Sequence, residues 1–154
     1  MIRPATVDDA AATAHVHVES WRSTYRGLMP DAVLDGLLVE RRTEVWRSVI
    51  ERAEKQFVFV AEDEGRVVGF VNGGPEREQN SVYTAELYAL YVLKAQQGRG
   101  HGRALFGATV KAFVERDHRA MLLWVLSTNP SRGFYEKVGG RYLKTKPIEI
   151  GGET

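Results

Sequence analysis

Runs of alternating or continuous hydrophobic residues in the second half of the chain predict β-strands. The first two runs, 57–62 and 66–71, are separated by Asp63-Glu64-Gly65, which has the composition of a tight turn. We therefore expect these two strands to pair as a hairpin. Gly73-Gly74-Pro75 interrupts the pattern, so we expect the second strand to end before it and a polar loop to follow at 76–80.

Three later hydrophobic runs predict the remaining strands of the sheet. They cover 82–92, 121–127 and 141–150. A glycine-rich segment and a run of helical composition separate the first of them from the second. This order of strands and helices predicts an α/β sandwich with a mixed sheet.

Hydrophobic residues at helical spacing predict helices before, between and after these strands. Thr6 followed by Asp9 has the form of a capping pair, and it predicts a helix from Ala10 to about Arg22 that ends at Arg26-Gly27. Further helical segments are expected at 30–38, 40–55, 104–115 and from Pro130 to Gly139-Gly140. The apolar stripe of the second of these consists of Val45, Trp46, Val49 and Ile50.

Composition is typical of one globular domain over residues 1–154. The chain has 44% hydrophobic and 27% charged residues, which argues against disorder. A net charge of +1 gives no support to a broad nucleic-acid-binding surface, and the lack of cysteine excludes disulfides and a cysteine nucleophile. We see no signal peptide, membrane-length apolar run or H-x-x-x-H metal pair, so we expect a cytoplasmic protein with no membrane, nucleic-acid or metal partner.

The most informative segment is the glycine-rich run Gln97-Gly98-Arg99-Gly100-His101-Gly102-Arg103, between the strand at 82–92 and the helix at 104–115. Alternate glycines allow tight turns and leave the backbone amides open to a ligand. A helix that starts there adds unpaired N–H groups and the positive end of its dipole. The segment therefore predicts a phosphate-binding or pyrophosphate-binding site.

Spacing distinguishes this loop from two common phosphate loops. A P-loop requires Lys followed by Ser or Thr after its last glycine, and no such pair follows a glycine at that spacing. A dinucleotide loop has the pattern G-x-G-x-x-G. If Gly98 and Gly100 were its first two glycines, the third would be at position 103, which is Arg. The pattern Q-x-x-G-x-G does fit, with Gln97, Gly100 and Gly102. In this pattern the chain resembles the GNAT superfamily of acyl-CoA-dependent N-acyltransferases, whose corresponding motif holds the CoA pyrophosphate.

The resemblance extends well beyond the loop. It includes 85–92, 102–106 and the segment 129–140, which is similar to the family's N-x-x-x-x-x-Y-x-x-x-G-F/G pattern, and 2–6 is similar to its first strand. The resemblance implies a GNAT-like fold of the mixed α/β (α+β) class. Such a fold has a central, mostly antiparallel twisted sheet of about six or seven strands, flanked by about four helices and splayed at the acyl-CoA slot.

The resemblance also implies roles for individual residues. Tyr135 matches the family's general-acid tyrosine, and Glu86 is the candidate general base. Asn129 matches an asparagine that contacts the pantetheine arm. The expected cofactor-binding residues are Leu90, Tyr91, Val92, Gln97, Gly98, Arg99, Gly100, His101, Gly102, Arg103, Asn129 and Tyr135. Structural alternatives stay open for three of these candidates: Tyr135 as an aromatic anchor, Glu86 as a solvated or paired strand residue, and Asn129 as a helix cap.

The first helix carries candidates for acceptor binding. His17, Trp21 and Tyr25 recur every four residues, which places them on one helix face. In the family the region after this helix helps to form the acceptor pocket, so Trp21 and Tyr25 are the expected substrate-binding residues. The alternative is an amphipathic helix that packs these aromatic residues into the core.

The sequence thus predicts an acetyl-CoA-dependent N-acetyltransferase that acts on the primary amine of a small molecule, by direct transfer in a ternary complex. The resemblance implies a fold that often forms homodimers. Three other functions stay open: a non-catalytic CoA-binding regulatory module, a protein N-terminal or lysine acetyltransferase, and a nucleic-acid-binding domain that uses the arginine-rich loop. The fold does not identify the acceptor.

Overall fold

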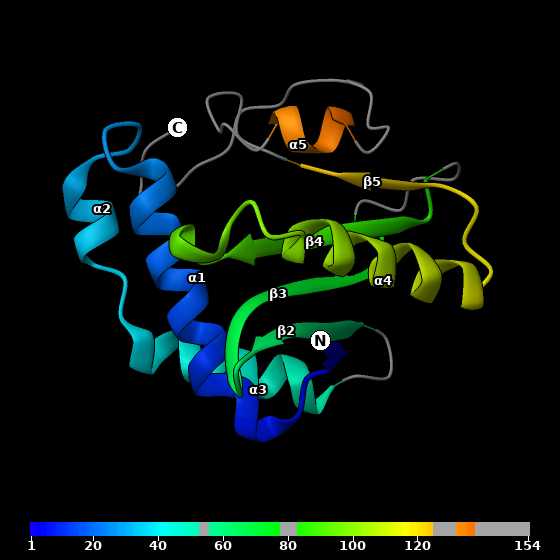
Figure 1. Cartoon of the computed structure of the whole chain (residues 1–154), viewed down its shortest axis with the longest axis horizontal. Coiled ribbons are helices and arrows are strands. Elements are labelled where there is room, and N and C mark those ends of the chain that lie inside the picture. Colours follow the sequence, from blue (N-terminus) through cyan, green and yellow to red (C-terminus); the bar gives the residue numbers. More distant parts are fainter. Residues whose placement is uncertain (53–55, 78–82, 125–131, 138–154) are drawn as a thin grey trace.

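A five-stranded sheet with helices packed against it forms the described part of the computed structural model, residues 1–52, 56–77, 83–124 and 132–137 (Figure 1). In chain order the elements are β1 (Ile2–Pro4), η1 (Val7–Asp9), α1 (Ala10–Tyr25), α2 (Asp31–Asp35), α3 (Val39–Glu51), β2 (Phe57–Asp63), β3 (Arg66–Pro75), β4 (Ala85–Val92), η2 (Lys94–Gln96), α4 (His101–Glu115), β5 (Met121–Leu123) and α5 (Arg132–Lys137). The strands lie in the order β1-β2-β3-β4-β5, and only the β4–β5 pair of this described sheet is parallel. The expected mixed, mostly antiparallel sheet is therefore confirmed.

The described residues contain five strands and five α-helices, where about six or seven strands and about four helices were expected. The expected strand at 141–150 and the end of the one at 121–127 lie outside the described residues. The short helix α2 occupies 31–35 within the segment predicted at 30–38. The first long helix begins at Ala10 as predicted, but the capping pair belongs to the 3-10 turn η1 before it, where the Thr6 amide donates to the Asp9 carboxylate at 2.7 Å.

The hairpin between β2 and β3 is the one that the sequence predicted. Glu64 and Gly65 form its turn, and both have positive φ, 51° and 79°. Two consecutive residues of positive φ are typical of a type I′ turn, whose twist matches that of the flanking strands. The pairing of Asp63 with Arg66 closes the hairpin.

β3 continues through Gly73-Gly74-Pro75, so the predicted break there is wrong. These residues pair with the first residues of β4. A Cβ on Gly73 would lie 2.8 Å from the ring of Phe57, and one on Gly74 would lie 2.8 Å from the Tyr88 hydroxyl. The glycines thus make room for aromatic side chains that cross the backbone, and the strand does not need side chains to keep its ladder hydrogen bonds.

A β-bulge in β4 changes which of its residues face each side of the sheet. Asn72 and Gly73 are consecutive in β3, but they pair with Ala89 and Leu87, so Tyr88 has no partner opposite it. One extra residue in a strand shifts the alternation of the side chains that follow. The two halves of β4 therefore alternate in opposite phase.

The packing of β4 follows this change of phase. Leu87 and Leu90 both belong to the cluster that includes Leu105 of α4. Tyr91 packs against the cluster formed with α1 and α3. Because neighbours on a strand face opposite sides, Glu86 lies on the same side as Tyr91.

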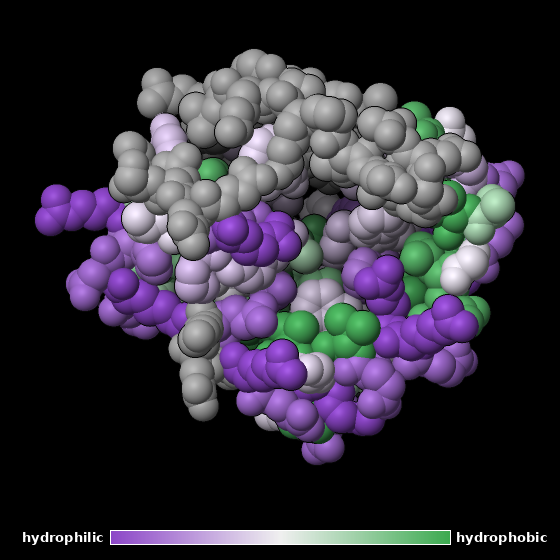
Figure 2. Space-filling view, turned by 180° about the vertical axis from the view of Figure 1, so that it is seen from behind, coloured by the Kyte–Doolittle hydropathy of each residue, from purple (hydrophilic) through white to green (hydrophobic). Residues whose placement is uncertain are grey.

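Hydrophobic residues fill both faces of the sheet. Trp46 of α3 packs with Phe70 of β3 on one face, and Leu105 and Phe113 of α4 pack on the other. Val45, which the sequence placed in the apolar stripe of α3, is 48% exposed and lies outside the core. The coloured part of the surface in Figure 2 is mostly hydrophilic. None of the described helices has both the length and the apolar character needed to cross a bilayer.

Gly69 lies where β3 approaches β4 and α4 closely. A Cβ on Gly69 would be 2.9 Å from the Tyr91 carbonyl oxygen and 3.3 Å from Leu105 Cδ1. We expect Gly69→Ala to lower the free energy of unfolding by about 1 to 3 kcal/mol, because a backbone oxygen moves only if β4 moves. Urea titration measures the change. Gly107→Ala is the control, since a Cβ there meets no described atom within 4 Å; equal destabilisation of both variants would contradict this account.

Candidate active site

The glycine-rich segment joins β4 to α4, and its second half is already helical. α4 begins at His101, so His101, Gly102 and Arg103 form its first turn, where the sequence had suggested a helix from Ala104. The Ala104 amide donates to the Gly100 carbonyl at 3.0 Å. The amides before Ala104 have no intrahelical acceptor, and they mark the positive end of the helix dipole.

Two of the three glycines have the backbone conformation that favours glycine. Gly98 and Gly100 have φ values of 81° and 88°, and a Cβ on either would meet no atom of the described residues within 4 Å. Gly102 has no positive φ, and a Cβ there would lie 3.6 Å from the Phe134 ring. The segment is therefore open at Gly98 and Gly100, while Gly102 lies next to α5.

The polar side chains of the segment differ in their surroundings. Gln97 Nε2 donates to the Val92 carbonyl at 3.1 Å, which ties the segment to the end of β4. The Arg99 side chain is 61% exposed and lies 3.9 Å from an Asp63 carboxylate oxygen, and Arg103 is exposed. His101 Nε2 is buried without a hydrogen-bond partner among the described residues.

The described pairing of β4 with β5 covers three residue pairs. Ala85 to Leu87 pair with Met121 to Leu123. Within the described residues, β4 has no partner on that edge from Tyr88 to Val92. Backbone groups on an unpaired edge can bind an extended ligand. The rest of the strand predicted at 121–127 lies outside the described residues, so the expected splaying of the strands stays a prediction. The predicted cofactor residues Leu90, Tyr91 and Val92 lie on this part of β4.

Candidate residues from three elements meet around Tyr91. Trp21 Nε1 donates to the Tyr91 hydroxyl at 2.7 Å, and the Trp21 and Tyr25 rings lie edge-on with centroids 5.0 Å apart. Burial first, then the nearby phenol groups of Tyr25 and Tyr135, raise the pKa of Tyr91. The structure thus brings the two predicted acceptor residues and the predicted acid together beside the predicted cofactor strand.

Tyr135 is held in this cluster by its neighbour on α5. The ring of Phe134 lies 6.4 Å from that of Phe106 on α4 and 5.3 Å from that of Tyr135, measured between centroids. Burial, followed by the effect of Tyr25, raises the pKa of Tyr135 to about 12. The phenol is therefore protonated at neutral pH, which a proton donor requires.

His17 belongs to the aromatic face that the sequence predicted for α1. The centroid distances of 5.9 Å between His17 and Trp21 and 5.0 Å between Trp21 and Tyr25 confirm that these residues share a face. The His17 ring stacks on Tyr91, and its Nδ1 accepts a hydrogen bond from Trp46 Nε1 at 3.1 Å. Burial, followed by the charge of Arg42, lowers the pKa of His17 to about 4.

Glu86 is buried and bound by a single arginine. Arg77 Nη2 lies 2.5 Å from Glu86 Oε2, and Arg77 Nε and its backbone amide donate to Oε1 at 3.2 and 3.1 Å. Sequence reasoning did not single out Arg77, because it follows β3 in a polar stretch and no motif relates it to Glu86. The pair could have been found from the expected antiparallel pairing of consecutive strands, because such pairing brings the end of β3 next to the start of β4.

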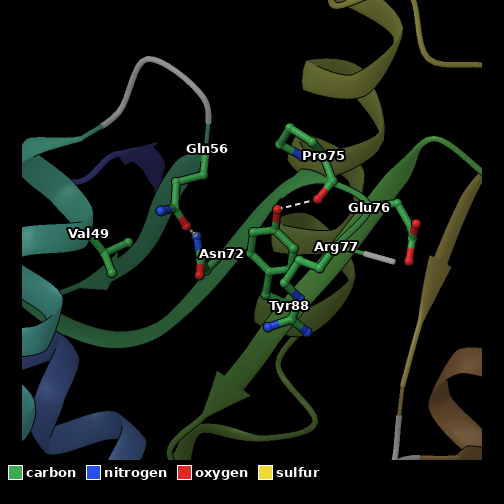
Figure 3. A pocket seen from close by; sticks show the side chains of 7 residues that line it. All are labelled: Val49, Gln56, Asn72, Pro75, Glu76, Arg77 and Tyr88. Atoms are coloured by element: carbon green, nitrogen blue, oxygen red, sulfur yellow. Dashed lines mark hydrogen bonds between the residues drawn. The ribbon is translucent and has the colours of Figure 1, made fainter. Parts of the chain in front are cut away.

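A pocket of about 550 Å³ lies on the side of the sheet that α3 covers (Figure 3). Residues that line it include Val49, Gln56, Asn72, Arg77 and Tyr88. The Arg77 guanidinium carbon lies 4.5 Å from the centroid of the Tyr88 ring. Tyr88 donates its hydroxyl hydrogen to the Pro75 carbonyl, and Asn72 Nδ2 donates to Gln56 Oε1 at 3.1 Å. Sequence reasoning missed these residues, since their proximity depends on the bulge and the strand register.

One predicted site residue, Asn129, lies outside the described residues. The described ranges contain no group of three or more His, Cys, Asp or Glu side chains arranged to hold a metal ion.

Comparison with known proteins agrees with this arrangement. The family model "Acetyltransferase (GNAT) family" matches residues 17–140. The uncharacterized N-acetyltransferase YuaI of Bacillus subtilis is 37% identical over 98% of this chain and 86% of its own length, and an uncharacterized N-acetyltransferase of Archaeoglobus fulgidus is 33% identical over 87% and 88%. The PaiA N-acetyltransferase from Thermoplasma acidophilum, solved with coenzyme A, shares the fold with a TM-score of 0.84 and 22% identity over 95% of this chain and 92% of that one. The family model and these relatives show that the chain belongs to the GNAT family of acetyltransferases.

Proposed function

We propose that the protein transfers the acetyl group of acetyl-CoA directly to the primary amine of a small molecule while both are bound. The observation that carries this proposal is the turn at Gly98 and Gly100, which joins the end of β4 to the N-terminus of α4 and in which a Cβ would meet no described atom within 4 Å. A strand end followed by such a turn suits a long ligand with a phosphate-rich end. Coenzyme A in the PaiA structure supports the choice of donor.

The donor is held along its whole length. Backbone groups of 90–92 bind the pantetheine arm, and the amides at Gly98 and Gly100 with the positive end of α4 bind the pyrophosphate. Arg99 and Arg103 supply positive charge around the phosphates.

The acyl transfer needs one base and one acid. Glu86 takes a proton from the acceptor ammonium, so that the neutral amine can attack the thioester carbon. Tyr135 donates its hydroxyl hydrogen to the departing CoA thiolate, and its raised pKa keeps that hydrogen in place. Trp21 and Tyr25 form one wall of the acceptor site. The chain contains no cysteine that could carry the acetyl group, which favours direct transfer.

Calorimetric titration tests the donor site. We expect saturable binding of acetyl-CoA and desulfo-CoA, and weaker binding of ATP. Gly100→Ala is expected to weaken acetyl-CoA binding about tenfold, because a side chain strains the left-handed backbone at this position and covers the amides. Gly107→Ala, in the middle of α4 with no described atom near its Cβ, is the matched control.

Two results, one from this titration and one from a thiol-release assay, would contradict the proposal in different ways. A folded protein that does not bind acetyl-CoA would remove the acyltransferase site altogether. Binding without thiol release, over a panel of small primary amines, would instead favour a regulatory module that binds CoA.

A further inference from the structure

The pair formed by Arg77 and Glu86 is asymmetric in its exposure. The Glu86 side chain is 2% exposed, whereas that of Arg77 is 62% exposed. Arg77 lines the pocket described above, and Glu86 is not among its lining residues. One fixed, buried carboxylate is therefore covered by a long side chain that reaches it from the solvent side.

The surroundings of the Arg77 guanidinium are those of a site for an organic cation. Both Glu86 oxygens bind it, and the Tyr88 ring lies 4.5 Å away, within the range of a cation–π contact. The Tyr88 hydroxyl is bound to the Pro75 carbonyl, which fixes the ring. A buried carboxylate and a fixed aromatic face thus already bind a positively charged group, and that group belongs to the chain itself.

A buried carboxylate without a counter-cation is destabilising, so Glu86 needs a positive partner for as long as it is ionised. Arg77 fulfils this need in the structure. An alkylammonium ion can fulfil the same need, because it offers a positive charge and N–H donors to the same oxygens and the same ring.

We propose that Arg77 occupies the binding site of the acceptor's ammonium group, and that the acceptor is a cationic small amine that displaces Arg77 from Glu86 and the Tyr88 ring. The proposal rests on the proposed acetyl transfer, with Glu86 as its base. Arg77 is then an internal competitor of the acceptor and not a catalytic residue.

The displacement prepares the chemical step. Once the ammonium replaces Arg77, one N–H bond breaks and one O–H bond forms at Glu86, which gives a neutral amine and a neutral carboxylic acid. Neutral groups are favoured over an ion pair in a buried site. The amine nitrogen then bonds to the acetyl carbon as the carbon–sulfur bond breaks, and its second proton goes to the thiolate through Tyr135.

Cation binding without any turnover is the first test. We would measure melting temperatures of the parent, Arg77→Gln and Arg77→Gln/Glu86→Gln in n-propylammonium chloride or methylguanidinium chloride, against NaCl of equal ionic strength. Arg77→Gln should gain roughly 4 °C at saturating cation, and the parent clearly less, because the cation must first displace Arg77. The double variant, which lacks the carboxylate charge, should gain nothing. Equal gains in all three proteins would overturn the proposal.

Kinetics provide the second test, and they separate this proposal from the reaction itself. Arg77→Gln should lower the KM for a small cationic amine about tenfold and leave kcat within about threefold, because the competing side chain is gone. A raised KM or a strongly lowered kcat would overturn the competitor role. Arg41→Ala, which removes an exposed arginine at the start of α3, is the control and should change neither constant. If no protein releases thiol, the acetyl transfer fails, and the melting experiment still decides the cation site.

Discussion

Tyr135→Phe is expected to lower kcat about a hundredfold, while the dissociation constant of acetyl-CoA stays within about threefold of the parent value. The substitution keeps the ring that packs beside Phe134 and removes only the hydroxyl group. If that hydroxyl protonates the leaving thiolate, its loss affects the transition state and not the bound donor. Stopped-time thiol release at saturating acetyl-CoA measures kcat, and calorimetry measures donor binding.

The pH profile adds a second criterion to this prediction. Because burial raises the pKa of Tyr135 to about 12, the phenol of the parent stays protonated between about pH 7 and about pH 10. The difference in kcat should therefore persist over that whole range. Unchanged turnover of Tyr135→Phe with every acceptor would mean that Tyr135 is an aromatic anchor, the alternative left open by the sequence.

The parent protein is expected to lose about 3 kcal/mol of folding stability between pH 6.5 and pH 4 through His17 alone, since its pKa falls from 6.5 to about 4 on folding. In this range the unfolded chain binds a proton that the folded chain does not. The contribution is fully present above pH 6.5 and is lost as the pH falls toward 4. A protonated ring has no acceptor nitrogen for Trp46 Nε1, so the hydrogen bond between them is lost as well.

Denaturant titrations at both ends of this pH range test the effect. His17→Gln retains a hydrogen-bond acceptor for Trp46 but does not titrate, so its stability should change about 3 kcal/mol less than that of the parent. His15→Gln is the control, because His15 is exposed on the same helix. The assignment to His17 fails if the parent and the His17→Gln variant lose stability in parallel.

Local chemistry explains which parts of the fold were predictable. The hairpin turn at Glu64-Gly65 depends only on these two residues, both of which adopt positive φ. The hairpin was therefore predictable from the local sequence. Gly73 and Gly74 are also turn-forming residues in the local sequence, but β3 continues through them. Whether they break a strand or admit the Phe57 and Tyr88 rings depends on contacts with β2 and β4, which no local pattern records.

The candidate site likewise has one part that the local sequence predicts and another that depends on how the elements pack. The glycine turn before α4 was predictable, because a turn and a helix start depend on only a few consecutive residues. The pair of Arg77 and Glu86 was not, because it arises from the register between β3 and β4. The gathering of Trp21 and Tyr135 at Tyr91 likewise requires three elements to be packed first.

The bulge at Tyr88 makes the number of residues in β4 matter independently of their identity. Glu86 and Tyr91 are five positions apart, yet they share one side of the sheet because the strand contains one unpaired residue between them. A homologue that lost or gained a residue here would turn Tyr91 toward α4 and Leu90 toward the aromatic cluster. Side chains along this strand can therefore be exchanged without moving their neighbours to the other side of the sheet, whereas a single-residue insertion or deletion would separate Glu86 and Tyr91 onto opposite sides.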